Sequence, residues 1–385
     1  MNLLAPVRQM QRTANCAKRA IVPLQLLRDQ IPAIMTERRG EKLIGIQLGR
    51  AVAAILVVLY HGGRMLPQYL GHIDVAKYFT FGNAGVDFFF VLSGFIIFYV
   101  HQQDINNPAR LGHYLFRRIT RVYPIYWAVT LLAIGLLVAK SDWVTLSPWH
   151  VIASLLLIPE ARQDPLVGVA WTLCHEMLFY LVFSIFIFSR IIGIYAVALW
   201  TAVVAFGLFV PHSGLLYFIE SPYHIEFAFG ALAAYLARAK PVRIAPALAG
   251  LGILAFLIVG LKFNDLLGEN QFAGRLLYGL SSTLIIYGLA VWESGGNLRY
   301  PGWAAYLGAA SYSIYLIHTF LLGWAGRLAA NLVVPGSAPD LLYLMSVLAA
   351  VIGGCALYQF VEKPLQAMTR RKPSLPLPGV ARPQE

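Results

Sequence analysis

Apolar runs of about twenty residues recur along this 385-residue chain, and they limit its fold more than any other feature. A helix needs about 20 apolar residues to cross about 30 Å of hydrocarbon, where every backbone polar group must be bonded internally. One such run could be a buried helix of a soluble protein, but this chain has ten. They predict an all-α bundle of about ten transmembrane helices, at 43–62, 79–100, 122–139, 166–189, 191–210, 223–238, 244–262, 275–292, 303–324 and 341–361.

Composition agrees with a membrane protein. Hydrophobic residues make up 58% of the chain and charged residues 12%, which is about half the charged share of soluble domains. The apolar segment Trp149–Pro159 is too short to cross and is predicted to lie at the membrane interface. The three cysteines, Cys16, Cys174 and Cys355, lie far apart and form no paired metal motif.

The net charge of +12 is read here as a topology signal rather than as a nucleic-acid site. Lysine and arginine collect in short cytoplasmic loops of membrane proteins, and an inside N-terminus puts most of the 30 cations there. We expect both termini in the cytoplasm, with a basic tail over 1–42, a membrane domain over 43–365 and a Pro-rich tail over 366–385. The basic tail has no apolar core of the kind that signal peptides carry.

Arg50 and His61 mark the two ends of the first run. Eleven residues amount to about 1100° of helix, about 20° past three full turns, so both side chains share one face about 16 Å apart. Ionisable groups inside a membrane are costly and are therefore candidates for function. The plainer alternative is that Arg50 extends to the inner headgroups while His61 sits at the outer interface.

Asp87 lies in the outer half of the second run, within "GVDFFFVLSGF", and needs a partner, because an unpaired aspartate is expensive there. His61 is the natural partner, and the pair would fix the imidazole tautomer. Alternatively, Asp87 is an interfacial residue satisfied by water. Ser93 and Gly94 form a small patch that permits close helix approach.

Arg118 and Arg121 share a helix face in the cytoplasmic segment "RRITRVYPIYW". Guanidinium groups bind phosphate and stack on rings, so this pair suits a ligand with phosphates and a flat base. The aromatic residues behind it would help, and they are Tyr123, Tyr126 and Trp127. The alternative is ordinary inside charge beside an interfacial aromatic belt.

Glu176 lies near the middle of the fourth run, in "AWTLCHEMLFY" beside Trp171. His175 and Glu176 are not a zinc motif, because position 179 holds Phe where H-E-x-x-H needs histidine. We expect no metal. Glu176 could organise a polar site or an acceptor sugar, or it could be a protonated glutamate bonded to a neighbouring helix.

Two further polar sites lie late in the chain. Tyr315 and His318 share one helix face in "SYSIYLIH". We expect them to bind the acceptor or to support the site; the alternative is that both are plain interfacial residues. Glu362 and Pro364 in "EKPL" predict the end of the last helix at the cytoplasmic face.

Taken in order over residues 43–365, these pieces resemble acyltransferase family 3 of bacterial integral membrane proteins, and its exopolysaccharide O-acetyltransferases most of all. The resemblance implies transfer of an acyl group, usually acetyl from acetyl-CoA, to a hydroxyl of an exported or surface carbohydrate. It implies that His61 is catalytic, that Arg50 matches the family's first-span arginine, and that Arg118 and Arg121 help to hold the CoA donor.

Four positions depart from the family pattern. Gln47 stands where aspartate is frequent, Gly49 where leucine is common, and Thr172 where serine is usual; His175 is atypical before the glutamate. None of these removes a catalytic group. They leave the donor and the acceptor open.

The combined expectation is a multi-pass enzyme of the bacterial inner membrane. Its catalytic set is His61, Asp87 and Glu176, its donor-binding set is Arg50, Arg118, Arg121 and Tyr123, and its supporting set is Ser93, Trp171, Tyr315 and His318. It would use acyl-CoA as co-substrate without a permanently bound cofactor, take a free or lipid-linked carbohydrate as acceptor, and bind no nucleic acid. One rival is a transporter or flippase, whose path would be lined by Arg50, Asp87 and Glu176, although no inverted repeat is visible. A structural subunit of polysaccharide export is a third reading, and it leaves the buried charges unexplained.

Overall fold

The computed structural model describes residues 43–139, 146–160, 163–207, 215–239, 242–264, 271–295, 300–332 and 338–369. The chain divides into two compact units, Met1–Leu43 and Ile44–Glu385, and every element below belongs to the second. The predicted basic N-terminal tail and nearly all of the Pro-rich C-terminal tail lie outside the described residues.

Helices make up the architecture, and the described part of the chain contains no strand. The long helices are α4 (Ile44–Met65), α6 (Gly85–His101), α7 (Leu111–Ala139), α9 (Trp171–Phe188), α10 (Arg190–Gly207), α12 (Tyr223–Ala239), α13 (Ala245–Ile258), α15 (Gln271–Ser294), α16 (Gly302–Leu332) and α17 (Pro339–Leu357). The short ones are α5 (Pro67–Leu70), α8 (Pro148–Leu156), α11 (Leu215–Ile219) and α18 (Lys363–Thr369). Segments of 3₁₀-helix are η1 (Val75–Ala84), η2 (Gln102–Asp104), η3 (Pro108–Arg110) and η5 (Gly168–Ala170), and π-helical turns are η6 (Val259–Phe263) and η7 (Tyr358–Glu362).

Each of the ten predicted spans coincides with one of these helices. Within the described residues, nine helices are long and apolar enough to cross a membrane. The tenth, α12, has 17 residues, at the short end of the range that spans a bilayer. The all-α transmembrane bundle is thereby confirmed, while the side on which each terminus lies stays a prediction.

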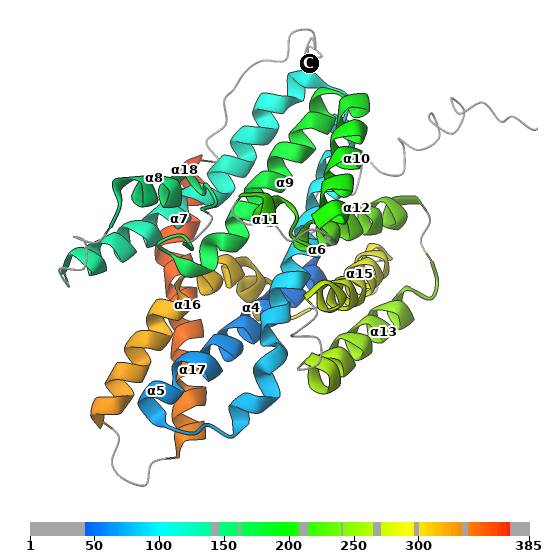
Figure 1. The fold of residues 1–385 in the computed structure, drawn as a ribbon. Helices are drawn as coiled ribbons and strands as arrows, with labels where there is room; N and C mark the ends of the chain where they lie inside the picture. Colours follow the sequence, from blue (N-terminus) through cyan, green and yellow to red (C-terminus); the bar gives the residue numbers. More distant parts are fainter. Residues whose placement is uncertain are drawn as a thin grey trace, which may run out of the picture. The chain divides into compact units, whose positions relative to one another are not determined.

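Helix α4 packs against α6, α16 and α17, so the helix that carries Arg50 and His61 lies in the middle of this unit (Figure 1). Small and branched residues make the contact, among them Ala54 and Val58 of α4 with Ile314 of α16. The Tyr343 hydroxyl of α17 donates to the Leu59 carbonyl at 2.9 Å. Packing on several sides fixes the rotation of α4, and therefore the direction in which its polar residues point.

Close backbone approach joins α6 to α12. A Cβ at Gly94 would collide with the Phe227 backbone, and a Cβ at Gly230 with the Val91 carbonyl. Small residues in membrane helices allow such approach, because dispersion and packing rather than hydrophobic exclusion hold the helices together. The predicted small patch at Gly94 is confirmed.

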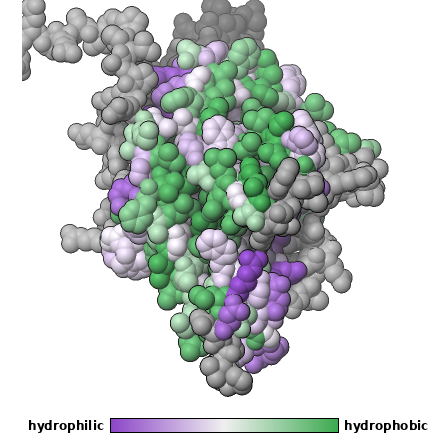
Figure 2. All heavy atoms as spheres, turned by 90° about the vertical axis from the view of Figure 1, so that its left-hand side faces the viewer, coloured by the Kyte–Doolittle hydropathy of each residue, from purple (hydrophilic) through white to green (hydrophobic). Residues whose placement is uncertain are grey.

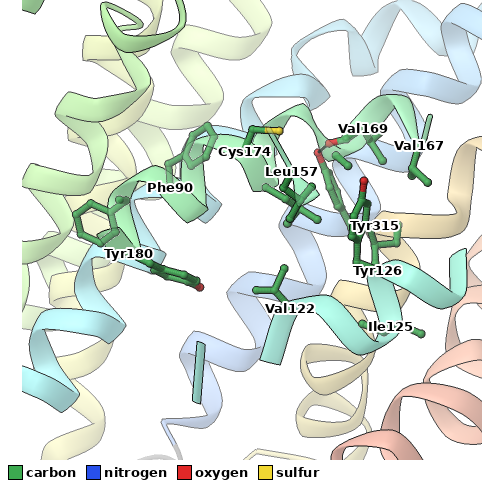
Figure 3. Close-up of a cluster of buried hydrophobic side chains, with 14 of the residues drawn as sticks. Phe90, Val122, Ile125, Tyr126, Leu157, Val167, Val169, Cys174, Tyr180 and Tyr315 are labelled. Carbon is green, nitrogen blue, oxygen red and sulfur yellow. Dashed lines mark hydrogen bonds between the residues drawn. The ribbon is translucent and has the colours of Figure 1, made fainter. Parts of the chain in front are cut away.

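A second apolar cluster joins α4, α6, α7, α9 and α16 around the polar groups described below. Figure 3 labels ten members of this cluster and shows Tyr315 and Tyr126 beside Val167 and Val169. Large apolar side chains also cover the outside of the helices. Figure 2 shows hydrophobic residues in green over the middle of one face. Among the exposed large apolar side chains are Leu131 and Val138 of α7 and Trp324 and Leu328 of α16. This surface matches the apolar interior of a bilayer.

Several helices differ from their predicted bounds, and two of these differences change the setting of a polar motif. α7 begins at Leu111, not near 122, so Arg118 and Arg121 lie within a helix that continues through Pro124. The predicted helix end at Glu362 and Pro364 is wrong, because α17 leads through η7 into α18. The reason is the π-turn before Pro364: it skips a position in the hydrogen-bond ladder, so a residue without an N–H can follow it without breaking the helix.

Candidate active site

His61 contacts His318, a residue 257 positions later in the chain. The His318 Nε2 lies 3.2 Å from the His61 Nδ1, with the ring centroids 4.8 Å apart. The sequence predicted Tyr315 and His318 on one face of α16, but not their meeting with α4. Packing of α16 on α4 brings the two histidines together.

Backbone carbonyls determine which nitrogen of each neutral ring carries the proton. The His318 Nδ1 lies 2.6 Å from the Tyr315 carbonyl, which can only accept, so this nitrogen donates. The His318 Nε2 is then an acceptor and takes its hydrogen bond from the His61 Nδ1–H, which also lies 2.9 Å from the Val57 carbonyl. The His61 Nε2 is therefore left with its lone pair, the form that a general base or nucleophile needs.

His318 is held firmly. Its side chain is fully buried, with an exposed fraction of 0%. One turn earlier, the Tyr315 hydroxyl lies 2.8 Å from the Val169 carbonyl and 2.9 Å from Thr172 Oγ1. These contacts tie α16 to the start of α9, so Thr172 supplies a hydroxyl where the family usually has serine.

The predicted pair of Asp87 with His61 is wrong. Asp87 is fully buried and forms an ion pair with Arg275 of α15, whose guanidinium lies 4.9 Å over the Tyr223 ring. The Glu226 carboxyl of α12 is also fully buried, and it interacts with both Asp87 and Arg275. Coulomb attraction to a guanidinium outweighs a contact with a neutral imidazole, which explains the choice of partner.

Sequence reasoning missed Arg275 and Glu226. Arg275 stands at the first position of the predicted span 275–292, whereas α15 begins at Gln271 and carries it one turn inside the helix. Glu226 could have been found from the sequence, because it lies in the predicted span 223–238 and an acidic residue inside a span is a functional candidate by default.

Glu176 forms hydrogen bonds to two hydroxyls. Ser93 of α6 donates to Glu176 Oε1 at 2.9 Å, and Tyr180, one turn along α9, donates to the same oxygen. Glu176 is therefore bonded to a neighbouring helix, α6, as one of the two alternatives from the sequence expected. Trp171 packs in an aromatic group with Phe90 and Tyr223, at ring-centroid distances of 6.3 and 5.2 Å.

Arg118 and Arg121 have different partners. Arg121 forms an ion pair with Glu362 at 3.4 Å, and Glu362 also accepts from Ser313 at 2.6 Å. Arg118 lies 3.3 Å from the His101 Nε2, and its own Nε is buried without a partner. The guanidinium of Arg118 thus has hydrogen-bonding capacity that the described residues leave unused.

Arg50 lies close enough to the ion pair of Arg121 and Glu362 to interact with it electrostatically. Its charge interacts with those of Arg121, Glu362 and Glu176. Its own hydrogen bond is a long one of 3.4 Å to Gln47, the position where the family often has aspartate. A neutral amide at position 47 adds no negative charge beside Arg50, so this network sets two arginines, Arg50 and Arg121, against Glu176 and Glu362.

The aromatic residues of α7 position another element. The hydroxyl of Tyr123 donates to the Leu156 carbonyl at 2.9 Å, Tyr126 donates to Ser154 at 2.5 Å, and the Trp127 indole donates to Leu155 at 2.8 Å. All three hold the end of the short helix α8. The ring beside Arg121 is Tyr312, 5.7 Å from the guanidinium carbon. A role for Tyr123 in donor binding stays a prediction.

Within the described residues, no three His, Cys, Asp or Glu side chains are grouped closely enough to hold a metal ion. Two of the groupings of ionisable side chains described above are separate networks. One contains Arg50, Arg121, Glu176 and Glu362, and the other contains Asp87, Glu226 and Arg275. His61 of α4 and His318 of α16 form a neutral contact apart from both.

Known proteins match this chain over most of its length. A family model described as an acyltransferase domain matches residues 43–359. The exopolysaccharide production protein ExoZ of Rhizobium meliloti (strain 1021) is 30% identical over 308 residues, which is 75% of this chain and 90% of that protein. A Staphylococcus aureus (strain COL) protein named as a candidate O-acetyltransferase is 23% identical over 366 residues, or 82% of this chain and 56% of that protein. No solved structure matches the chain.

Proposed function

Since the chain belongs to acyltransferase family 3 and is an acyltransferase with membrane-spanning helices, we propose that it transfers acetyl from acetyl-CoA to a carbohydrate hydroxyl. The acceptor is an exported or surface polysaccharide, free or lipid-linked, and the enzyme acts in the bacterial inner membrane. The name of the Rhizobium relative supports the exopolysaccharide, and the name of the Staphylococcus relative supports O-acetylation.

His61 is the catalytic base in this proposal. Its Nε2 takes the proton of the acceptor hydroxyl while the oxygen attacks the thioester carbonyl carbon. The carbon–sulfur bond then breaks, and the imidazolium returns the proton to the departing CoA thiolate. The alternative is a transient acyl group on the same nitrogen, with the same proton balance over both steps.

His318 takes the positioning role that the sequence gave to Asp87. Its accepting Nε2 holds the His61 Nδ1–H, so the other nitrogen of His61 points its lone pair away from α16. Asp87 is assigned instead to the ion pair with Arg275, which joins α6 to α15 beside the buried Glu226 of α12.

Acetyl-CoA enters from the side of Arg50, Arg118 and Arg121, which are called the arginine cluster below. The unused Nε of Arg118 and the weakly bonded Arg50 offer donors for the CoA phosphates. From Arg50 the same face of α4 leads to His61 over about 16 Å of helix axis. With the N-terminus in the cytoplasm, the donor binds inside and the acceptor meets His61 at the outer end.

The single observation that carries the proposal is the Nε2 of His61, which no described residue engages, in a tautomer fixed by the Val57 carbonyl and His318, on the face of α4 that also carries Arg50. Its test is the ester-linked acetate of exported glycan in a deletion strain that produces the wild type, His61→Ala or His113→Ala. His113 is an exposed histidine of α7 and serves as the matched control. We expect acetate with the wild type and with His113→Ala and none with His61→Ala; wild-type acetylation by His61→Ala would refute the role.

A transporter reading predicts movement of a solute without consumption of acyl-CoA. Membership of an acyltransferase family argues against it, because the enzyme class then accounts for the buried cations and for His61 together.

A further inference from the structure

A cavity of about 580 Å³ opens beside the His61 end of α4. Much of its wall comes from η1, a ten-residue stretch of 3₁₀-helix. A 3₁₀-helix has three residues per turn, so side chains three apart stand directly above one another. Lys77, Thr80 and Asn83 therefore form one straight polar row, and all three line the cavity. Runs of 3₁₀-helix this long are uncommon, and in an α-helix the row would rotate away from the cavity.

The cavity wall is basic. Arg64, Lys77 and Arg275 line it, and none of its described lining residues is acidic. Arg275 is neutralised by Asp87, so two cations remain. The contacts found for these two are with aromatic faces: Arg64 lies 5.8 Å from the Tyr60 ring centroid and Lys77 lies 5.2 Å from that of Tyr78. Two cations without carboxylate partners at one cavity attract an anion.

A hydrogen-bonding group stands beside those charges. Asn83 Oδ1 is buried without a partner in this cavity wall. A buried amide oxygen without a partner costs free energy, which a ligand donor would recover. A sugar hydroxyl is such a donor, and an amide can also turn to present its NH₂ to an acceptor.

The cavity is placed to serve His61. Arg64 follows His61 by three residues on α4, so the two share a face about 4.5 Å apart along the axis. Tyr60, which lines the cavity, has its ring centroid 5.1 Å from that of His61. An acceptor held in the cavity would thus lie beside the end of α4 that carries His61.

We propose that this cavity binds an anionic group of the acceptor through Arg64 and Lys77, with an adjacent sugar hydroxyl on Asn83. The acceptor is therefore an acidic carbohydrate, whose charge is a carboxylate of the sugar or a phosphate that links it to a lipid carrier. This inference rests on the proposed acetyl transfer and adds the chemical class of the acceptor.

The test is equilibrium binding to the purified full chain in detergent, with two matched pairs of probes. A disaccharide of glucuronic acid is compared with its methyl ester, which removes the carboxylate charge. Farnesyl-phosphate-linked glucose is compared with farnesyl glucoside, which removes the phosphate. The variants are Arg64→Gln, Lys77→Gln and Asn83→Ala, and the control is Arg327→Gln, an exposed cation that does not line the cavity.

We expect one anionic probe to bind at least tenfold more tightly than its neutral partner, and the pair that shows this identifies the source of the charge. Arg64→Gln and Lys77→Gln should each weaken that binding about tenfold, as loss of a charged hydrogen bond does, while Arg327→Gln leaves it unchanged. Asn83→Ala should weaken both members of the pair alike. Equal binding of charged and neutral probes overturns the proposal, as does competition by phosphatidylglycerol as strong as by the anionic probe.

Acetyl transfer distinguishes this failure from failure of the proposed function. If the protein acetylates neutral acceptors as well as acidic ones and Lys77→Gln transfers normally, the cavity proposal is wrong and the acetyltransferase stands. If His61→Ala transfers as well as the wild type, the catalytic assignment itself is wrong, whatever the cavity binds.

Discussion

At the scale of single residues, the contact between His61 and His318 is the feature that the sequence could not supply. Each histidine was visible as an ionisable group at the edge of a span. These residues are 257 positions apart, and their meeting depends on the register between α4 and α16. Helical periodicity carries no information about that register. A residue pattern can place side chains on a face, but it cannot say which two faces pack together.

The tautomer argument makes His318→Leu a test of positioning. His318→Leu removes one of the two acceptors of the His61 Nδ1–H and leaves the Val57 carbonyl, so the ring keeps its tautomer but is oriented less firmly. We expect kcat to fall about tenfold, as loss of one hydrogen bond of about 1–1.5 kcal/mol does. The KM for acetyl-CoA should change less than about twofold, because His318 contacts no residue of the arginine cluster. Steady-state kinetics on purified variants measure both. A purely structural role would change KM and thermal stability along with kcat.

Asp87 gives the opposite prediction. Asp87→Asn leaves the Arg275 charge buried without its carboxylate, and breaking a buried ion pair costs about 3–5 kcal/mol of folding free energy. We expect a lower midpoint of thermal unfolding in detergent, and recovery of that midpoint when Arg275→Met is added. A stable, inactive Asp87→Asn would instead restore Asp87 to the reaction.

At the scale of elements, the spans themselves were predictable, because the requirement for about 20 apolar residues acts on local sequence alone. The bounds of α7, α15 and the last helix were not. Amphipathic turns such as 111–121 and the start of α15 at Gln271 extend helices beyond their apolar cores. Arg275 was missed as a partner for Asp87 for this reason, since the predicted bounds put it at the edge of a span rather than one turn inside the helix.

The α6–α12 contact predicts a strong dependence on glycine. Gly230→Ala puts a methyl group against the Val91 carbonyl, so the helices must separate. We expect a loss of about 1–3 kcal/mol of stability, the usual cost of overpacking, seen as earlier thermal unfolding in detergent. Gly135→Ala in α7 is the matched control, because a Cβ there meets nothing within 4 Å. It should be neutral or slightly stabilising, since alanine favours a helix over glycine. Equal effects at both positions would argue against a tight α6–α12 contact.

At the scale of the whole molecule, α4 connects two kinds of site. The arginine cluster is predicted to hold acetyl-CoA, and the basic cavity beside His61 is proposed to hold the acceptor. Neither site follows from the apolar pattern, because each is assembled from helices distant in sequence. The order of the polar motifs along the chain did indicate the family, because that order can be read from the sequence without knowing which motifs contact each other.

The most direct test of the central claim is acetyl transfer by the purified protein in proteoliposomes. Radiolabelled acetyl-CoA is supplied on one side of the membrane and acidic oligosaccharide on the other, with the wild type, His61→Ala and the His113→Ala control. We predict labelled oligosaccharide with the wild type and with His113→Ala, and at least 100-fold less with His61→Ala. Transfer by His61→Ala at the wild-type rate would contradict the account.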